Sequence, residues 1–274
     1  LAATWSREVA AQYGNALGEE ARFREKDVIL GPGLNMYRSP LCGRNFEYMG
    51  EDPFLAGKLA VPYIQGVQKN GVAACLKHYA CNNEERYRHK TDVEVDERAL
   101  RELYLPAFEI AVKEGGAMTI MASYNLFRGT HCCHNGYLIN DILKKEWGFD
   151  GLVMSDWAGC HDTKEAVLGG LDCEFGTRVG KKMPAGKSVY DTYYLAEAYK
   201  QMILSGELTQ KELDDKVRRV LRTTFRTAMN TSKPFGSMTT QEHIDVARKV
   251  AQEGIVLLKN DEGQLPLKKA RKIS

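Results

Sequence analysis

The sequence has 274 residues, 43% of them hydrophobic and 27% charged, values that are ordinary for a globular protein with a sizeable core. Its 38 basic and 36 acidic residues give a net charge of only +2, and the basic residues are scattered, which argues against a nucleic-acid-binding protein. No apolar run reaches the roughly 18 residues that a membrane-spanning helix requires, so we expect neither a nucleic acid nor a membrane as a partner.

Helical periodicity recurs along the first part of the chain. We predict helices at 4–23, 54–69, 96–114, 137–146 and 161–168. The 96–114 helix is the clearest, because Asp96 and Glu97 complement the helix dipole at its start while Gly115 and Gly116 stop it.

Short apolar runs separate these helices and predict buried strands. The runs lie at 28–30, 72–76, 118–122, 152–154 and 167–171. Continuous apolar strands that alternate with helices are typical of a parallel sheet covered on both faces. We therefore predict an α/β fold, and a (β/α)8 TIM-like barrel rather than an open doubly wound sheet, because no G-x-G-x-x-G turn opens any of the helices.

The C-terminal third contains further helical segments and a change of composition. Residues 190–205 are predicted to be helical, and a longer helix follows the capping box formed by Thr209 and Glu212. The stretch 230–236 reads Asn-Thr-Ser-Lys-Pro-Phe-Gly, which is the composition of a linker.

A second unit is predicted beyond this linker. Thr239 and Glu242 form another capping box, whose helix should end at Gly254. The run IVLLKN at 255–260 is then predicted to be a new buried strand with no partner in the remaining residues. The chain is expected to stop as a second domain begins.

Polar side chains follow the predicted strands at the points where the strands end. They are Lys77 and His78, Tyr124 and Asn125, Asp156, and Asp172. Because the carboxyl ends of barrel strands converge on one mouth, these side chains predict a site there.

The residue types at this mouth favour a polyhydroxylated ligand. The cluster His131-Cys132-Cys133-His134 suits tetrahedral zinc poorly, since two adjacent cysteines rarely face one ion, so we predict no metal and a loop that is packed or lines the pocket rim. No G-x-S-x-G motif and no P-loop is present, and no cofactor is predicted. Carboxylates, cations and aromatic rings are the groups that bind and cleave sugars.

Five segments resemble, in order and spacing, the signatures of glycoside hydrolase family 3. They are GPGLNMYRSPLCGRNFEYMGEDPFLAG, LKHYACNNEE, MASYN, EWGFDGLVMSDWAG and QEGIVLLKN. The resemblance implies a retaining β-glucosidase-type enzyme that releases terminal non-reducing β-D-glucosyl or related residues through a covalent glycosyl-aspartate. It also implies a barrel domain at 1–229 that lacks its N-terminal part, a linker at 230–239, and the beginning of an α/β-sandwich domain at 240–274.

The resemblance assigns roles position by position. Asp156 matches the catalytic nucleophile. The substrate-binding residues that it implies are Arg44, Lys77 and His78 for the −1 sugar, Tyr124 beside the nucleophile, and Trp157 near the +1 subsite. We expect Lys77 or Arg44 to favour the ionised form of Asp156. Asp172 and Glu174 are also strand-end carboxylates. Pattern alone does not rank them below Asp156, but the resemblance implies that they have structural roles.

Part of the catalytic machinery is expected outside these residues. The resemblance places the general acid/base on a Glu beyond Ser274, and another −1 aspartate upstream of Leu1, so the rest of the polypeptide is an expected partner besides the glycoside. Three alternatives stay open: a non-catalytic sugar-binding fragment, a β-xylosidase, and a β-N-acetylhexosaminidase in which His89 and Asp92 would imitate a catalytic pair. The seven cysteines are interpreted as reduced structural thiols, and the compartment stays unknown.

Overall fold

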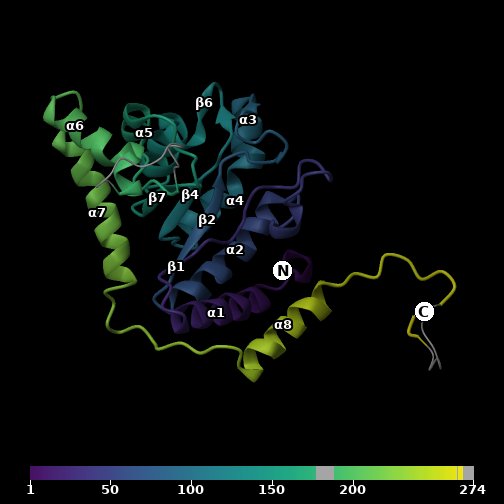
Figure 1. The fold of residues 1–274 in the computed structure, drawn as a ribbon. Helices are drawn as coiled ribbons and strands as arrows, with labels where there is room; N and C mark the ends of the chain where they lie inside the picture. The colour runs from purple at the N-terminus through teal and green to yellow at the C-terminus, as the bar shows by residue number, and fades with distance from the viewer. Residues whose placement is uncertain (177–187, 264, 268–274) are drawn as a thin grey trace.

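A computed structural model of the chain describes residues 1–176, 188–263 and 265–267. Its central element is a parallel sheet of four strands in the order β1-β2-β4-β7 (Figure 1). The strands are β1 (Val28–Ile29), β2 (Ala73–Tyr79), β4 (Thr119–Ala122) and β7 (Leu152–Ser155). The α/β class with a parallel sheet is therefore confirmed, and among the described residues the sheet does not close into a ring.

Register and burial explain why these runs form the sheet. Thr119 pairs with Leu152 on one side, and Cys75 pairs with Thr119 on the other. All four residues of β4 and all four of β7 are buried, as expected of strands covered on both faces. Beyond β7, Cys173 forms a single parallel bridge with Met154, so the segment around it extends the sheet without regular pairing.

Helices α1 (Arg7–Phe23) and α2 (Pro53–Gln68) lie side by side against the sheet (Figure 1). Two glycines allow their close approach. A Cβ at Gly14 would lie 2.3 Å from the carbonyl oxygen of Tyr63, and one at Gly66 would lie 2.6 Å from that of Ala11. The crossing therefore excludes any side chain at either position.

The predicted 96–114 helix is not continuous. It consists of α3 (Glu97–Ala99), a π-helical turn η3 (Leu100–Tyr104) and α4 (Pro106–Lys113). Pro106 accounts for the break, because it lacks the N–H of a regular helix and instead occupies the first position of a new one. The 137–146 helix is present as the π-helical η5 (Tyr137–Glu146).

The apolar run at 167–171 was wrongly predicted to be a strand. Val167 and Leu168 belong to α5 (Thr163–Gly169), which Asp162 caps by accepting a hydrogen bond from the backbone N–H of Glu165. Gly170 ends this helix in the left-handed conformation that favours glycine, with φ 96°.

The short elements complete the first two-thirds of the chain. Three small strands pair in the order β3-β5-β6, and three single turns are 3-10 helical. They are β3 (Asp92–Val93), β5 (Leu126–Phe127), β6 (Thr130–His131), η1 (Ala2–Thr4), η2 (Asn45–Glu47) and η4 (Cys132–His134).

The C-terminal third follows the predictions in part. In place of one helix at 190–205 there are three: η6 (Val189–Thr192), η7 (Tyr194–Ala198) and α6 (Tyr199–Leu204). The capping box of Thr209 and Glu212 does open α7 (Gln210–Arg226), which lies beside β7 (Figure 1). None of the helices in the described ranges is long and apolar enough to cross a membrane.

The end of the described chain departs from the predictions. Helix α8 (Gln241–Gly254) begins after Thr240 rather than Thr239 and packs on α1 (Figure 1). Residues 255–260 form no strand, and the side chains from Ile255 to Leu258 are exposed. A β-strand needs a neighbouring strand to bond its backbone, and the described residues provide none beside this segment.

Candidate active site

The carboxyl ends of β2, β4 and β7 bring the predicted site residues to one face of the sheet. Asp156 follows β7 directly, Tyr124 lies two residues after β4, and His78 is the second-to-last residue of β2. Nε2 of His78 lies 3.6 Å from Oδ2 of Asp156. The strand-end argument therefore located a real cluster of side chains.

Asp156 presents its two carboxylate oxygens differently. The residue is 6% exposed, and Oδ1 accepts a 2.7 Å hydrogen bond from the backbone N–H of Trp157. Oδ2 accepts no hydrogen bond from the described residues. One oxygen thus fixes the side chain, while the other is left with its lone pairs available.

His78 is neutral, and the bonds around its ring define the tautomer. Nη2 of Arg44 lies 3.0 Å from Nε2, and a guanidinium can only donate, so Nε2 is the acceptor. The proton is therefore on Nδ1, which donates to the hydroxyl of Tyr48 at 3.0 Å. Burial, and then Arg44 and Lys77, lower the pKa of His78 to about 2, so its approach to Asp156 is not an ion pair.

The two predicted cations are engaged by glutamates. Arg44 forms ion pairs with Glu47 and, at 3.7 Å, with Glu85, while Nζ of Lys77 lies 3.6 Å from Glu47. Neither cation pairs with Asp156 among the described contacts. Arg44 is linked to the nucleophile candidate through His78, which lies between them.

Three residues that the sequence did not single out hold His78 in place. Asn35 bonds the backbone N–H and C=O of His78 at 2.8 and 2.9 Å, and the amide of Asn82 donates to the Tyr48 hydroxyl at 3.3 Å. The one local signal in the sequence for this network was the spacing of Arg44 and Glu47, which are three residues apart and oppositely charged.

Aromatic groups border the carboxylate on its other side. Tyr124 is buried, and its pKa is raised by burial and then by the negative charge of Asp156. The guanidinium of Arg88 lies 4.5 Å from the Tyr124 ring centre, and the His89 ring 4.3 Å. Trp157 is 49% exposed, with its ring 5.7 Å from that of Phe175, so it forms an open aromatic edge.

The remaining strand-end carboxylates are occupied elsewhere. Asp172 accepts from Nζ of Lys144 at 2.7 Å and from the backbone N–H of Val153 at 2.8 Å. Glu174 accepts from the backbone N–H of Leu195 at 2.8 Å. Asp92 accepts from the N–H of Gly129 in the small sheet, whereas the His89 ring lies tilted against that of Tyr124, with 53° between their planes.

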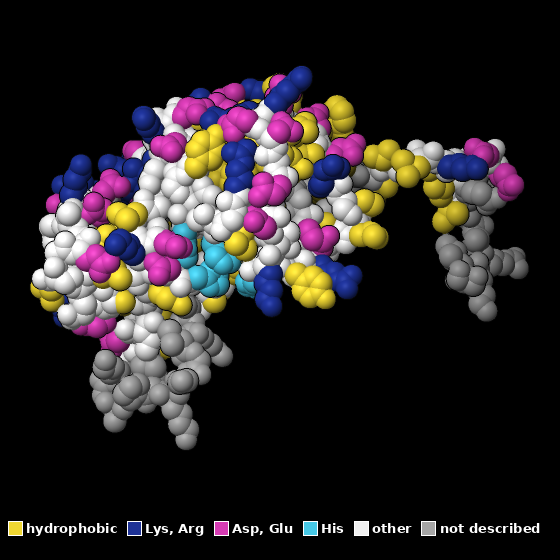
Figure 2. All heavy atoms as spheres, turned by 90° about the horizontal axis from the view of Figure 1, so that it is seen from above, with side chains coloured by type: hydrophobic (Ala, Val, Ile, Leu, Met, Phe, Trp, Pro, Cys, Tyr) yellow, Lys and Arg dark blue, Asp and Glu magenta, His cyan; other side chains and the backbone are white. Residues whose placement is uncertain are grey.

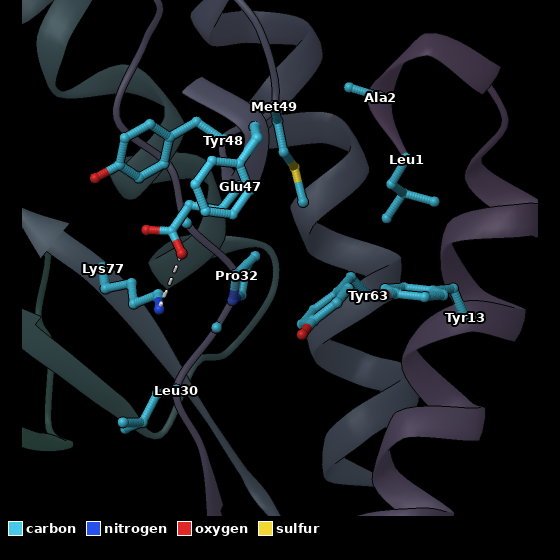
Figure 3. A pocket seen from close by; sticks show the side chains of 13 residues that line it. Leu1, Ala2, Tyr13, Leu30, Pro32, Glu47, Tyr48, Met49, Tyr63 and Lys77 are labelled. Atoms are coloured by element: carbon cyan, nitrogen blue, oxygen red, sulfur yellow. Dashed lines mark ion pairs between the residues drawn. The ribbon is translucent and has the colours of Figure 1, made fainter. Parts of the chain in front are cut away.

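A cavity of about 320 Å3 adjoins the site at Lys77 and Glu47, a size within the usual range of small-ligand pockets. Figure 3 shows Tyr13 and Tyr63, from α1 and α2, on one side of it and the Lys77–Glu47 ion pair on the other. The phenol rings lie 5.9 Å apart. The site thus continues into a space with both aromatic and polar walls.

The histidine and cysteine cluster lies at the rim of the site. Cys132, Cys133 and His134 are buried, and no group of three or more His, Cys, Asp or Glu residues in the described ranges has the geometry to hold a metal ion. Figure 2, which views the molecule from above Figure 1, shows histidine side chains gathered on this face. All seven cysteines have free thiols.

Comparison with known proteins gives consistent matches. Residues 1–223 match the family model described as Glycosyl hydrolase family 3 N terminal domain. The chain is 57% identical over 264 residues to beta-glucosidase BoGH3A of Bacteroides ovatus, covering 96% of this chain and 35% of that protein. It is 43% identical over 274 residues to thermostable beta-glucosidase B of Acetivibrio thermocellus, covering 100% and 34%.

A solved structure with the same fold is that of beta-glucosidase 3B from Thermotoga neapolitana in complex with glucose. The TM-score is 0.87 at 38% identity, over 98% of this chain and 37% of the other. The likeness confirms the predicted barrel type of the α/β fold. The chain spans about a third of the length of the curated relatives it matches.

Proposed function

This chain belongs to glycosyl hydrolase family 3, and we propose that it carries the nucleophile and the sugar-binding residues of a retaining β-glycosidase. The proposed substrate has a terminal, non-reducing β-D-glucosyl residue or a close relative of it. Because the chain covers only about a third of its curated relatives, the activity belongs to the whole protein.

The carboxylate of Asp156 is the observation that carries this proposal. Its Oδ1 is held by the N–H of Trp157, while Oδ2 is buried without a hydrogen bond from the described residues. A nucleophile needs one oxygen free to form a bond and a side chain that cannot rotate away from it. Asp172 presents no such oxygen, because Oδ1 accepts from Lys144 and Oδ2 accepts from the backbone N–H of Val153.

The reaction proceeds in two balanced steps. Oδ2 of Asp156 attacks the anomeric carbon, a carbon–oxygen bond to the protein forms, and the glycosidic carbon–oxygen bond breaks as its oxygen takes a proton from a general acid. Water then attacks the same carbon and passes a proton to that group, which releases the sugar and regenerates the Asp156 carboxylate. The two inversions leave the anomeric configuration unchanged.

The neighbouring side chains bind the sugar. Arg44 and Lys77 donate hydrogen bonds from fixed charges, since each is braced by Glu47. His78 is neutral and bonds to Arg44 and Tyr48 through its two ring nitrogens, so it holds Arg44 in position for the sugar. Tyr124 keeps its proton because its pKa is raised, so its hydroxyl can donate a hydrogen bond to a substrate oxygen beside Asp156. Trp157 covers the leaving-group side with its exposed ring.

The general acid is assigned to a glutamate beyond Ser274. Retaining hydrolysis needs a second carboxyl group about 5–5.5 Å from the first. We accordingly divide the chain into the barrel domain at 1–229, a linker at 230–239 and the beginning of a sandwich domain at 240–274. The start of α8 at Gln241 supports the second boundary, although linker residues also bond to α1 through Ser237 and Glu19.

Covalent labelling tests the nucleophile directly. The full-length gene product is incubated with a 2-deoxy-2-fluoro-β-D-glucoside that has a good leaving group, and the peptides are mapped by mass spectrometry. We expect one fluoroglucosyl adduct on Asp156. Asp156→Asn should lose labelling and several orders of magnitude in kcat, because covalent catalysis is removed. Asp150→Asn, at an exposed surface carboxylate, is the matched control and should behave as the wild type.

Each other result selects a different function. An adduct on another residue contradicts the assignment of Asp156. Glucose binding by calorimetry without any adduct or turnover indicates a non-catalytic sugar-binding protein. Faster cleavage of aryl β-xylosides identifies a β-xylosidase, and cleavage of aryl N-acetylglucosaminides that disappears in His89→Ala identifies a hexosaminidase.

A further inference from the structure

His134 connects the loop after Asp156 to α5. The residue ends η4 and is 4% exposed. Its Nε2 accepts a 3.0 Å hydrogen bond from the backbone N–H of His161, and an amide can only donate. The proton of His134 is therefore on Nδ1, which donates to Oε2 of Glu165 at 3.2 Å. The imidazole is neutral and holds a partner on each nitrogen.

Two further histidines link this loop to the one that follows β4. Nδ1 of His131 donates to the backbone C=O of Tyr124 at 3.2 Å. The rings of His131 and His161 stack with their centres 4.1 Å apart and an angle of 33° between their planes. The His134 ring lies 5.9 Å from the first and 6.1 Å from the second. Histidines gather on the face shown in Figure 2.

Tight packing makes the loop sensitive to the position of η4. A Cβ at Gly169 would lie 2.0 Å from the carbonyl oxygen of His134. A Cβ at Gly159 would lie 3.1 Å from Sγ of Cys133 and 3.2 Å from the carbonyl oxygen of Asp156. The backbone that carries Asp156 therefore rests directly on the residues of η4, and a shift of one displaces the other.

We propose that His134 is a positioning residue for the nucleophile: its neutral imidazole fixes the Asp156–His161 loop against α5 and thereby sets the distance between Asp156 and Tyr124. This inference rests on the proposed function, since it takes Asp156 as the reacting group. His134 itself touches no substrate and acts through the backbone of His161.

The neutral form of His134 is required for this arrangement. Protonation of Nε2 would point an N–H at the N–H of His161 and remove the bond. The titratable groups that face the ring are His131, His161, Glu165 and Asp162. Burial, the largest cause, lowers the pKa of His134, and its bond to Glu165 opposes this. Activity that depends on the bond is therefore retained above this pKa and lost as pH falls through it.

The test compares two substitutions of the same histidine in the full-length gene product. His134→Gln supplies a side-chain oxygen to the N–H of His161 and does not titrate, whereas His134→Leu supplies no acceptor. His243→Gln is the matched control, because His243 is similarly buried at 7% exposure but lies on α8. We measure kcat and KM from pH 4 to 9 with an aryl β-glucoside, and hydrogen exchange of the His161 amide.

For His134→Leu we expect kcat to fall about a hundredfold with KM little changed, since a displacement near 1 Å at the reacting atoms has such an effect. The His161 amide should exchange about tenfold faster, as the loss of one hydrogen bond implies. His134→Gln should recover most of kcat and extend activity to lower pH than the wild type shows. His243→Gln should alter neither kcat nor the acid limb.

Two results would overturn the proposal. One is equal kcat and equal pH profiles in the Leu, Gln and wild-type proteins, and the other is an unchanged exchange rate of the His161 amide in His134→Leu. If the wild-type protein neither cleaves any glycoside nor is labelled by one, the proposed function is contradicted instead. The exchange measurement still decides whether His134 holds the loop in that case.

Discussion

Nη2 of Arg44 lies 3.0 Å from Nε2 of His78, and this contact makes the histidine an acceptor toward the arginine. The same guanidinium pairs with Glu47 and Glu85, so four side chains share one arrangement of donors and acceptors. The site is thus organised around Arg44 rather than around a charge contact to Asp156.

Replacing Arg44 by lysine should weaken sugar binding. A lysine has one nitrogen and cannot donate to His78 and both glutamates at once. Each charged hydrogen bond is worth about 1.5–3 kcal/mol, so KM for an aryl β-glucoside should rise at least about tenfold in Arg44→Lys. Arg38→Lys, an exposed change in the same segment, should leave KM unchanged. Equal KM values in both variants would contradict the role of Arg44.

Removing Lys144 should destabilise the chain, because it leaves the buried carboxylate of Asp172 without its cation. The side chain of Asp172 is fully buried, and Lys144 lies 2.7 Å from it. Breaking such a buried pair costs about 3–5 kcal/mol, because the remaining carboxylate is left without its cation. Chemical denaturation of Lys144→Met should show this loss. Lys145→Met, its exposed neighbour, is the control and should unfold at the wild-type denaturant concentration.

Helix α8 should dock on α1 in a pH-dependent way. His243 lies 2.8 Å from Glu19 and 3.2 Å from Glu20. Burial alone would lower the pKa of His243, but these two bonds outweigh it and raise the pKa above the ordinary 6.5. For Glu19, burial opposes and the His243 bond favours ionisation, and its pKa falls below 4.5.

The sign of each shift defines the pH window. The contribution of His243 is complete below pH 6.5 and is lost as pH rises through its raised pKa. That of Glu19 is complete above pH 4.5 and is lost as pH falls through its lowered pKa. Amide protection of α8 should therefore be greatest between these values and decline toward pH 9. In His243→Gln the decline on the alkaline side should be absent, and a persistent decline would point to another group.

A methyl group at the α1–α2 crossing should be poorly tolerated. In Gly14→Ala the new Cβ would lie 2.3 Å from the carbonyl oxygen of Tyr63, so the helices must separate, at a cost of about 1–3 kcal/mol. Gly136→Ala is the matched control, since that glycine has φ −60° and the nearest atom to its Cβ is 3.7 Å away. The control should be stabilised by up to about 1 kcal/mol. Thermal unfolding of the two variants measures the contrast.

Local sequence pattern was sufficient to predict the position of a side chain that directly follows a strand. Lys77, Tyr124 and Asp156 each follow an apolar run, and parallel strands bring their carboxyl ends together whatever the loops do. Pro106 was also visible as a helix-breaking signal, and the continuous helix was predicted against it.

Contacts between distant loops could not be read in this way. Asn35 and Tyr48 hold His78 across 43 and 30 residues of sequence, and no periodicity reports such a pairing. The pattern at 255–260 shows the opposite limit, because an apolar β-branched run predicts a strand only when a second strand is available to it. Its side chains are exposed because the described residues provide no second strand beside it.

The charged side chains at the mouth of the site are balanced in number. Arg44, Lys77 and Arg88 are matched by Glu47, Glu85 and Asp156, and His78 adds no charge. The mouth therefore projects little long-range field, and an uncharged glycoside neither gains nor loses encounter rate from ionic strength. For the proposed glycoside substrate, we therefore expect recognition to depend on short-range contact between its hydroxyls and the donors and acceptors already held in place.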